Sequence, residues 1–133
     1  MNKKSIFLVS HSQKITDGIK EMIEQMQINE YVTLYSLGGT AKGLLGSDPM
    51  KIMEAIHSAQ NSTDILVFAV LGSAVMNCEL VYDMLDEGLK KKYHLIDASL
   101  VEGAFAAAMT AGVTDDLKQI INEAKKASVK GWK

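Results

Sequence analysis

The residue best placed for covalent chemistry is a histidine near the amino terminus. His11 comes one or two residues after an apolar run, between Ser10 and Ser12. Imidazole can attack phosphorus as a nucleophile, and the resulting phosphoramidate is reactive enough to pass its phosphoryl group on. Such a site also needs donors for the phosphoryl oxygens, and the two serine hydroxyls are small enough to supply them. These residue types predict that His11 can carry a phosphoryl group.

A second group of small residues would supply backbone donors. Gly72, Ser73 and Ala74 follow the most continuous apolar run and open a helical pattern. At the start of a helix the free N–H groups and the helix dipole favour an anion, and Ser73 adds a hydroxyl. Glycine lets the backbone come close to a phosphate, because a side chain would block the approach. We expect these residues to face His11 and to hold its phosphoryl oxygens.

The glycine-rich stretch 38–46 is the third candidate part of this site. It follows a predicted strand, so Gly38 and Gly39 would lie alongside His11 and approach the phosphoryl oxygens. The stretch matches no nucleotide-binding motif. No Gly-Lys-Ser/Thr opens the next helix, as a P-loop requires, and the pyrophosphate fingerprint is missing after the first predicted strand. An ordinary flexible connection is the alternative interpretation of this stretch.

Other chemistries have little support in the chain. His57 lies off the apolar face of a predicted helix, and His94 lies inside a predicted strand. No Gly-x-Ser-x-Gly elbow and no Cys/His cluster with metal-ligand spacing occurs, so we expect no metal or cofactor in this chain. The single Cys78 lies at helical spacing with apolar residues, which favours a packed thiol over a catalytic one and fits a reducing cytoplasm.

Charge and hydropathy narrow the possible partners. The formal charge of −2 provides no long-range attraction to nucleic acid, and the basic cluster Lys90-Lys91-Lys92 is expected to be a short solvated loop. No apolar run approaches the ~20 residues that a membrane helix needs. A length of 133 residues suits one domain, and we expect 1–133 to form a single one.

Apolar periodicity alternates between strand and helix patterns with short connections. Strands are expected at 5–9, 31–37, 64–71 and 92–96. Helices are expected at 14–28, from Pro49 behind a capping Asp48, from 72 to about 87, and in the patterns 101–108 and 117–124. The helix at 14–28 should present one apolar face, formed by Ile15, Ile19, Met22, Ile23 and Met26.

This alternation predicts an α/β fold, with a doubly wound, mainly parallel four-stranded sheet and helices on both faces. The simplest strand order is 2-1-3-4. Ligands of such sheets bind beyond the carboxyl ends of the strands, where the winding changes direction. That crevice lies between the first and third strands, where loops 10–13 and 71–74 meet. We expect the apolar residues in or after the loops to stay exposed for partner proteins, namely Leu44, Leu45 and Met76.

Four short motifs occur in order along nearly the whole chain. They are Val9-Ser10-His11-Ser12, then Gly38-Gly39 followed by Leu45-Gly46-Ser47, then Leu71-Gly72-Ser73-Ala74, and last Leu100-Val101-Glu102-Gly103-Ala104. Together they resemble the phosphotransfer subunit of the phosphoenolpyruvate-dependent dihydroxyacetone kinase. The core of that subunit is similar to the mannose-type enzyme IIA domain of the sugar phosphotransferase system. The resemblance implies a cytoplasmic homodimer in which His11 is the phosphorylated residue.

The resemblance also implies the partners. The phosphoryl donor would be the small histidine-phosphorylated carrier protein of the sugar phosphotransferase system. The acceptor would be ADP held on the nucleotide-binding subunit of dihydroxyacetone kinase. The nucleotide (ADP or ATP) and its magnesium would therefore belong to that partner and not to this chain.

Two positions depart from the family pattern. The family usually has aspartate where this chain has Val70, and proline where it has Ser99. By resemblance the carboxylate orients the active histidine, and valine has no group that fixes a tautomer or stabilises positive charge. His11 would then depend on a backbone carbonyl or a serine. The alternative hypothesis is an inactive paralogue that keeps the docking surface. A third interpretation, a flavodoxin-like signalling receiver, has less support. It would need an acidic cluster at the ends of the first and third strands, where this chain has Ser10, His11 and Val70.

Overall fold

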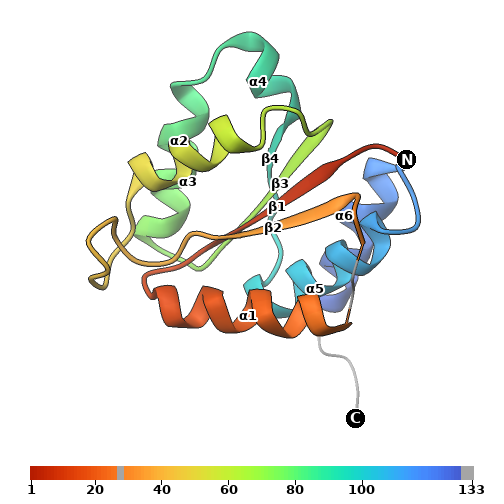
Figure 1. Cartoon of the computed structure of the whole chain (residues 1–133), viewed down its shortest axis with the longest axis horizontal. Helices are drawn as coiled ribbons and strands as arrows, with labels where there is room; N and C mark the ends of the chain where they lie inside the picture. The colour runs from red at the N-terminus through yellow and green to blue at the C-terminus, as the bar shows by residue number, and fades with distance from the viewer. Residues whose placement is uncertain (27–28, 130–133) are drawn as a thin grey trace.

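A four-stranded parallel sheet forms the centre of the protein (Figure 1). The computed structural model describes residues 1–26 and 29–129. Its strands run in the order β2-β1-β3-β4 and are β1 (Lys4–Val9), β2 (Val32–Ser36), β3 (Asp64–Ala69) and β4 (Tyr93–Leu95). Its helices are α1 (Gln13–Met26), α2 (Pro49–Ser58), α3 (Ser73–Asp83), α4 (Glu87–Lys92), α5 (Leu100–Ala111) and α6 (Leu117–Ala127). The predicted fold class and strand order are confirmed.

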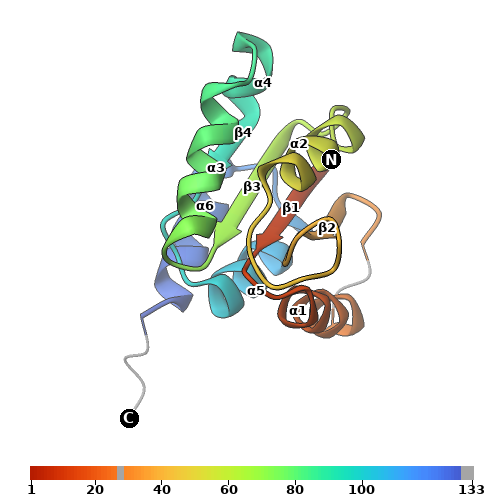
Figure 2. The same cartoon turned by 90° about the vertical axis from the view of Figure 1, so that its left-hand side faces the viewer.

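Helices cover both faces of the sheet (Figures 1 and 2). The first face packs against α1, α5 and α6, and the second packs against α2 and α3. Alternate residues of β1 serve the two faces, because Ile6 and Leu8 join the first core cluster whereas Phe7 and Val9 join the second. A strand that is buried on both sides needs apolar residues at every position. This explains the continuous apolar runs at residues 6–9 of β1 and 65–69 of β3.

The start of α2 follows the local signals in the sequence. The Asp48 carboxylate accepts a hydrogen bond of 3.0 Å from the Met50 N–H, and Pro49 takes the first helical position, where its missing N–H costs nothing. The buried side of the helix carries Ile52, Ala55 and Ile56. Capping and burial therefore set α2 as predicted.

The helix predicted from 72 to about 87 is confirmed over 73–83, but its predicted end is wrong. The structure ends α3 at Asp83, and Asp86 begins a separate short helix by accepting a 2.8 Å hydrogen bond from the Leu89 N–H. Lys90, Lys91 and Lys92, predicted as a loop, form the last turn of this α4. Three cations at the carboxyl end of a helix are favoured by its dipole. The missed signal was an acidic cap followed by a basic last turn.

The apolar face predicted for the first helix is also wider than the one that the sheet buries. Of the residues of α1, Ile19 and Ile23 are buried in the core of the protein, together with Thr16. The other three predicted members stay exposed, namely Ile15, Met22 and Met26. The predicted last turn at 27–28 lies outside the described residues. The buried side of α1 therefore includes the polar Thr16, which a pattern of apolar residues does not select.

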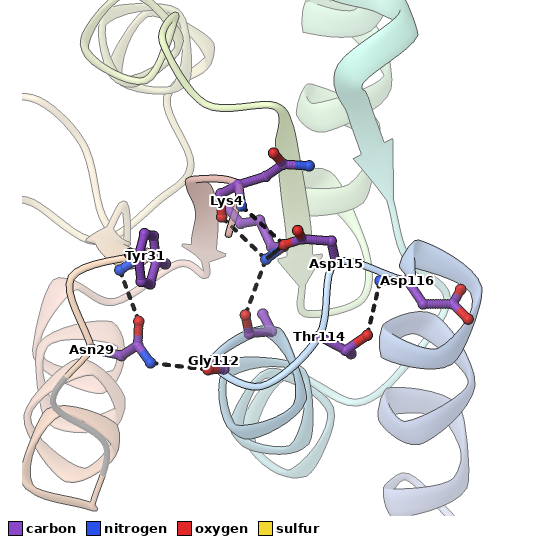
Figure 3. Close-up of polar contacts among 9 residues, drawn as sticks. Lys4, Asn29, Tyr31, Gly112, Thr114, Asp115 and Asp116 are labelled. Carbon is purple, nitrogen blue, oxygen red and sulfur yellow. Dashed lines mark hydrogen bonds and ion pairs between the residues drawn. The ribbon is translucent and has the colours of Figure 1, made fainter.

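A buried lysine fastens the amino end of the sheet (Figure 3). Lys4 is 2% exposed, and its Nζ donates to the Asn2 and Ala111 carbonyl oxygens, each at 3.1 Å, and to the Asp115 carboxylate at 2.7 Å. A buried ammonium is costly unless it is paired and hydrogen-bonded, and here all three of its protons have an acceptor. The contacts tie the first residues of β1 to the end of α5 and to the α5–α6 connection.

A second polar contact fastens the same end from the side of β2. The Asn29 side chain donates to the Gly112 carbonyl oxygen at 3.0 Å and accepts from the Tyr31 N–H at 2.8 Å (Figure 3). The amino ends of β1 and β2 are thus both held to the end of α5. This leaves the opposite, carboxyl end of the sheet as the end where loops are free to form a site.

Replacing Asp115 tests whether its ion pair with Lys4 stabilises the fold. Hydrogen bonds from Lys4 and from the Asn2 N–H hold the pKa of the Asp115 carboxyl below its ordinary value of 3.8. A carboxyl whose pKa is lower in the folded state stabilises the fold above the unfolded pKa, and this contribution is lost as pH falls through the folded value. We expect Asp115→Asn to lower the free energy of unfolding at pH 7, by an amount that shrinks as pH falls below about 4. Urea unfolding of both proteins across pH measures it. The exposed aspartate Asp83, changed to Asn, is the control, and a pH-independent difference at Asp115 would contradict the ionic role.

Candidate functional site

The loop that carries His11 is fixed by its own serines. β1 ends at Val9, and the buried Ser10 Oγ donates to the Ser12 carbonyl oxygen at 2.8 Å while it accepts from the Ser12 N–H at 3.0 Å. These two bonds close a tight turn around His11 before α1 begins at Gln13. The turn presents the imidazole at the carboxyl end of β1, half-buried.

His11 meets Ser73 across the crevice between β1 and β3. The distance from His11 Nε2 to Ser73 Oγ is 2.6 Å, within hydrogen-bond range. Ser73 reaches this place because β3 ends at Ala69 and Gly72 turns the chain with a φ of +85°, a conformation that favours glycine. The sequence prediction that His11 and the Gly72–Ser73 turn lie on facing loops therefore agrees with the geometry.

The amino terminus of α3 is open toward His11. Gly72 stands at its N-cap position and makes no side-chain capping hydrogen bond. By contrast, α2, α4, α5 and α6 each have a cap side chain that accepts from a first-turn N–H group. The first N–H groups of a helix have no partner inside the helix, and the helix dipole makes this end positive. The end of α3 nearest to His11 can therefore accept an anion.

Gly38 and Gly39 shape the histidine loop from the side of β2. The Gly38 N–H donates to Thr16 Oγ1 at 2.9 Å, and the Gly39 N–H donates to the Ser10 carbonyl oxygen at 3.1 Å. A Cβ at position 38 would lie only 2.1 Å from the Ser12 carbonyl oxygen. Both N–H groups are thus already engaged, and the role that their geometry supports is to position the loop. The direct contact of both glycines with phosphoryl oxygens, expected from the sequence, stays a prediction.

The rest of the glycine-rich stretch is attached to the same loop. The Gly46 N–H donates to the His11 carbonyl oxygen at 2.8 Å, so residues 44–46 lie beside the site. Leu44 and Leu45 are 65% and 80% exposed, and Met76 on α3 is 67% exposed. These three side chains are as exposed as the sequence predicted, and Leu71 next to the Gly72 turn is more exposed still, at 89%. Apolar side chains that the monomer does not bury are therefore carried by the loops next to His11 and by α3.

Val70, next to the end of β3, has only hydrocarbon in its side chain. Its N–H continues the sheet by donating to the Val9 carbonyl oxygen at 3.1 Å, and its partly buried side chain packs against the cores on both faces. Ser99, the second departure from the family pattern, caps α5 through a 3.2 Å bond from the Gly103 N–H and also bonds Glu102 and Ser128. Ser99 thus starts a helix, as proline often does. Val70, by contrast, cannot accept a hydrogen bond from a histidine ring as a carboxylate would.

The remaining reactive side chains have structural roles. Burial raises the pKa of the Cys78 thiol to about 12, which fits the predicted core thiol. His57 is exposed on α2, as predicted. His94 pairs with Asp64 across β4 and β3, with 2.9 Å between Nε2 and Oδ1; the sequence gave no sign of this pair because the two residues are thirty positions apart.

Neither a metal centre nor a membrane span was found in the described part of the chain. No group of three or more His, Cys, Asp or Glu side chains within residues 1–26 and 29–129 is arranged to hold a metal ion. Over the same ranges, no helix combines the length and the apolar character needed to cross a bilayer.

Fold and site together define an enzyme IIA-type domain. The family described as "PTS system fructose IIA component" matches residues 5–121, and the chain belongs to this family. It is similar to the phosphoryl donor subunit DhaM of PEP-dependent dihydroxyacetone kinase 2 from Listeria innocua, with 44% identity over 90% of this chain and 94% of that protein. DhaM of Lactococcus lactis, a phosphotransferase subunit of PTS-dependent dihydroxyacetone kinase, is 37% identical over 82% and 85%.

Two further relatives show how the same domain occurs elsewhere. The DhaM subunit of Providencia stuartii is 35% identical over 92% of this chain, which spans only 26% of that longer protein. The crystal structure of EF1359, a protein of unknown function, superposes with a TM-score of 0.91 at 62% identity and 98% coverage of both chains. The fold and the recognition from sequence motifs are thus confirmed.

Changing Gly38 tests whether it positions the histidine loop. We expect Gly38→Ala to lower the free energy of unfolding by about 1–3 kcal/mol, because its Cβ would overlap the Ser12 carbonyl oxygen. The same change should displace His11 and alter its ring resonances in NMR spectra. Gly18→Ala is a matched control, since a Cβ there meets nothing within 4 Å and alanine favours the middle of α1. Equal stability of the two variants would contradict the close approach.

Proposed function

We propose that this chain is the phosphocarrier subunit of a PEP-dependent dihydroxyacetone kinase. It accepts a phosphoryl group on His11 from the histidine-phosphorylated carrier protein of the sugar phosphotransferase system. It then passes the group to ADP on the nucleotide-binding subunit of the kinase. The observation that carries the proposal is the 2.6 Å approach of His11 Nε2 to Ser73 at the uncapped start of α3. The DhaM names of the relatives support the kinase assignment.

In the proposed reaction, Nε2 is the nitrogen that attacks phosphorus. It lies 2.6 Å from Ser73 Oγ at the start of α3, whose open N–H groups would hold the phosphoryl oxygens as the transfer proceeds. The bond between phosphorus and the donor's histidine nitrogen breaks as the bond between phosphorus and Nε2 forms. In the second transfer, a terminal phosphate oxygen of ADP attacks phosphorus, the bond to Nε2 breaks and ATP forms. Ser10 and Ser12 keep the His11 turn closed throughout.

The nucleotide and its magnesium belong to the partner in this proposal. This chain contributes the nucleophile and the anion-binding helix end, while ADP and its metal ion are held by the nucleotide-binding subunit. The exposed apolar side chains around His11 would contact both partners in turn. We also propose that the subunit works in the cytoplasm as a homodimer.

A docking module without efficient transfer is the second candidate function. The observation that favours it is Val70, which gives His11 no carboxylate to fix its tautomer. The intact His11–Ser73 contact and the open helix end favour the active carrier.

Phosphorylation of His11 separates the two functions. The chain is incubated with phosphoenolpyruvate, enzyme I and the histidine carrier protein, and acid-labile phosphate is measured. We expect His11→Ala to abolish incorporation, because no other residue would act as the nucleophile. His57→Ala removes an exposed histidine away from the site and should incorporate phosphate like the wild type. Incorporation into His11→Ala, or none into a wild-type chain that binds the carrier, would contradict the proposed function.

Binding of the carrier protein tests the docking surface independently of phosphoryl transfer. We expect Leu44→Asp combined with Leu45→Asp to raise the Kd for the carrier protein at least about tenfold, because it places charges where apolar contact is needed. The thermal midpoint should hardly change, since both side chains are mostly exposed. Val113→Asp is the control, on an equally exposed residue in the α5–α6 connection at the other end of the sheet. An unchanged Kd in the double variant would exclude this surface.

A further inference from the structure

His11 has to present an unprotonated nitrogen to phosphorus, and Val70 does not help it to do so. A neutral imidazole exchanges its proton between Nδ1 and Nε2 unless a hydrogen bond fixes one tautomer. Val70 has no polar side-chain atom, and its backbone N–H is already bonded to Val9. Among the described residues, the one side-chain partner recorded for the His11 ring is Ser73.

The electrostatics of α3 decide which way this hydrogen bond runs. Ser73 is the first residue of the helix, where the dipole creates a positive potential. A positive potential favours a lone pair on Nε2 over an N–H group that points the same way. The Ser73 hydroxyl can then donate its proton to this lone pair. The ring proton is left on Nδ1, on the side away from the helix.

We infer that Ser73 is the positioning residue of His11. Its hydroxyl donates to Nε2 and holds the ring in the Nδ1–H tautomer, with the reactive lone pair aimed at the open end of α3. Ser73 thereby orients the ring through Nε2, the reactive nitrogen. Val70 has no polar group that could orient it through Nδ1. The inference deepens the proposed function, because it concerns the nitrogen that would take the phosphoryl group.

The hydroxyl also has a place once transfer begins. As the bond between phosphorus and Nε2 forms, the lone pair is used, and the Ser73 proton turns from Nε2 to a phosphoryl oxygen. The proton stays on Oγ, so no acid or base is consumed. When the phosphoryl group leaves, the hydroxyl returns to Nε2 and restores the same tautomer for the next cycle.

A role in positioning differs measurably from a role in holding phosphoryl oxygens. A carboxylate introduced by Val70→Asp could accept the Nδ1 proton and fix the same tautomer from the opposite side. Ser73 would then be largely redundant as a positioning residue. A hydroxyl that only held phosphoryl oxygens would matter equally with valine or aspartate at position 70. The two substitutions are therefore expected to be coupled.

The first test reads the tautomer directly in the unphosphorylated protein. ¹⁵N NMR of histidine-labelled protein at about pH 9, where imidazole is neutral, shows which ring nitrogen carries the proton. We expect Nδ1–H to dominate in the wild type, to give way to a mixture in Ser73→Ala, and to return in Ser73→Thr, which keeps the hydroxyl. Ser58→Ala, a serine on the exposed side of α2, should leave the wild-type signal. An unchanged tautomer ratio in Ser73→Ala, or Nε2–H in the wild type, would overturn the inference.

The second test measures the rate of His11 phosphorylation in a double-mutant cycle. We expect Ser73→Ala to slow transfer about 10- to 100-fold with valine at position 70, and less than about threefold in the Val70→Asp background. Equal losses in both backgrounds would show that Ser73 acts on phosphoryl oxygens alone and would overturn the positioning role. If Val70→Asp does not fold, the comparison of Ser73→Ala with Ser73→Thr replaces the cycle, and no rescue by threonine then counts against the inference. A tautomer effect in a chain that never takes phosphate would refute the proposed function and leave Ser73's role intact.

Discussion

The parallel pairing of β1 with β3 is the interaction on which the candidate site depends. Its register places Val9 opposite Ala69 at the carboxyl ends of the two strands. His11 follows the first of these residues by two positions, and Ser73 follows the second by four. A register shift of one residue would turn the strand's side chains to the wrong faces and separate the two loops. Burial on both faces of the sheet fixes the register, so core packing sets the distance between the imidazole and the start of α3.

The close approach of the β2 loop to the histidine turn is the second constraint. The Ser12 carbonyl oxygen occupies the space where a side chain at position 38 would begin, and Thr16 reaches from α1 to bond the Gly38 N–H. Thr16 is fully buried although it is polar, because its hydroxyl also bonds Ser36. A polar group in a core position costs free energy unless it is bonded. Here these two hydrogen bonds of Thr16 offset this cost. They also connect α1 to the end of β2 and so help to fix the geometry of the histidine loop.

These constraints explain which features the sequence could predict. Alternating apolar runs were enough for the strand order, and a histidine and a serine that each follow a buried strand were enough to bring His11 and Ser73 together. Periodicity was not enough where a polar residue replaces an apolar one in the core, as Thr16 does in α1, or where a new cap restarts a helix, as Asp86 does. The burial of Lys4 could not be predicted from the sequence, because it depends on Asp115, which is distant along the chain.

The two ends of the sheet have opposite polar arrangements, and this difference bears on function. At the amino end the Lys4 ammonium finds three acceptors, which closes that end of the fold. At the carboxyl end, α3 lacks the side-chain cap that four other helices have. With glycine at the N-cap, the omission of a capping side chain costs only about a few tenths of a kcal/mol. The same omission leaves N–H groups free next to His11. A cap there would fill the place where the proposed phosphoryl group would bind. The helix end is stable without one because Ala74, Cys78 and Val81 already fix α3 in the core on one face of the sheet.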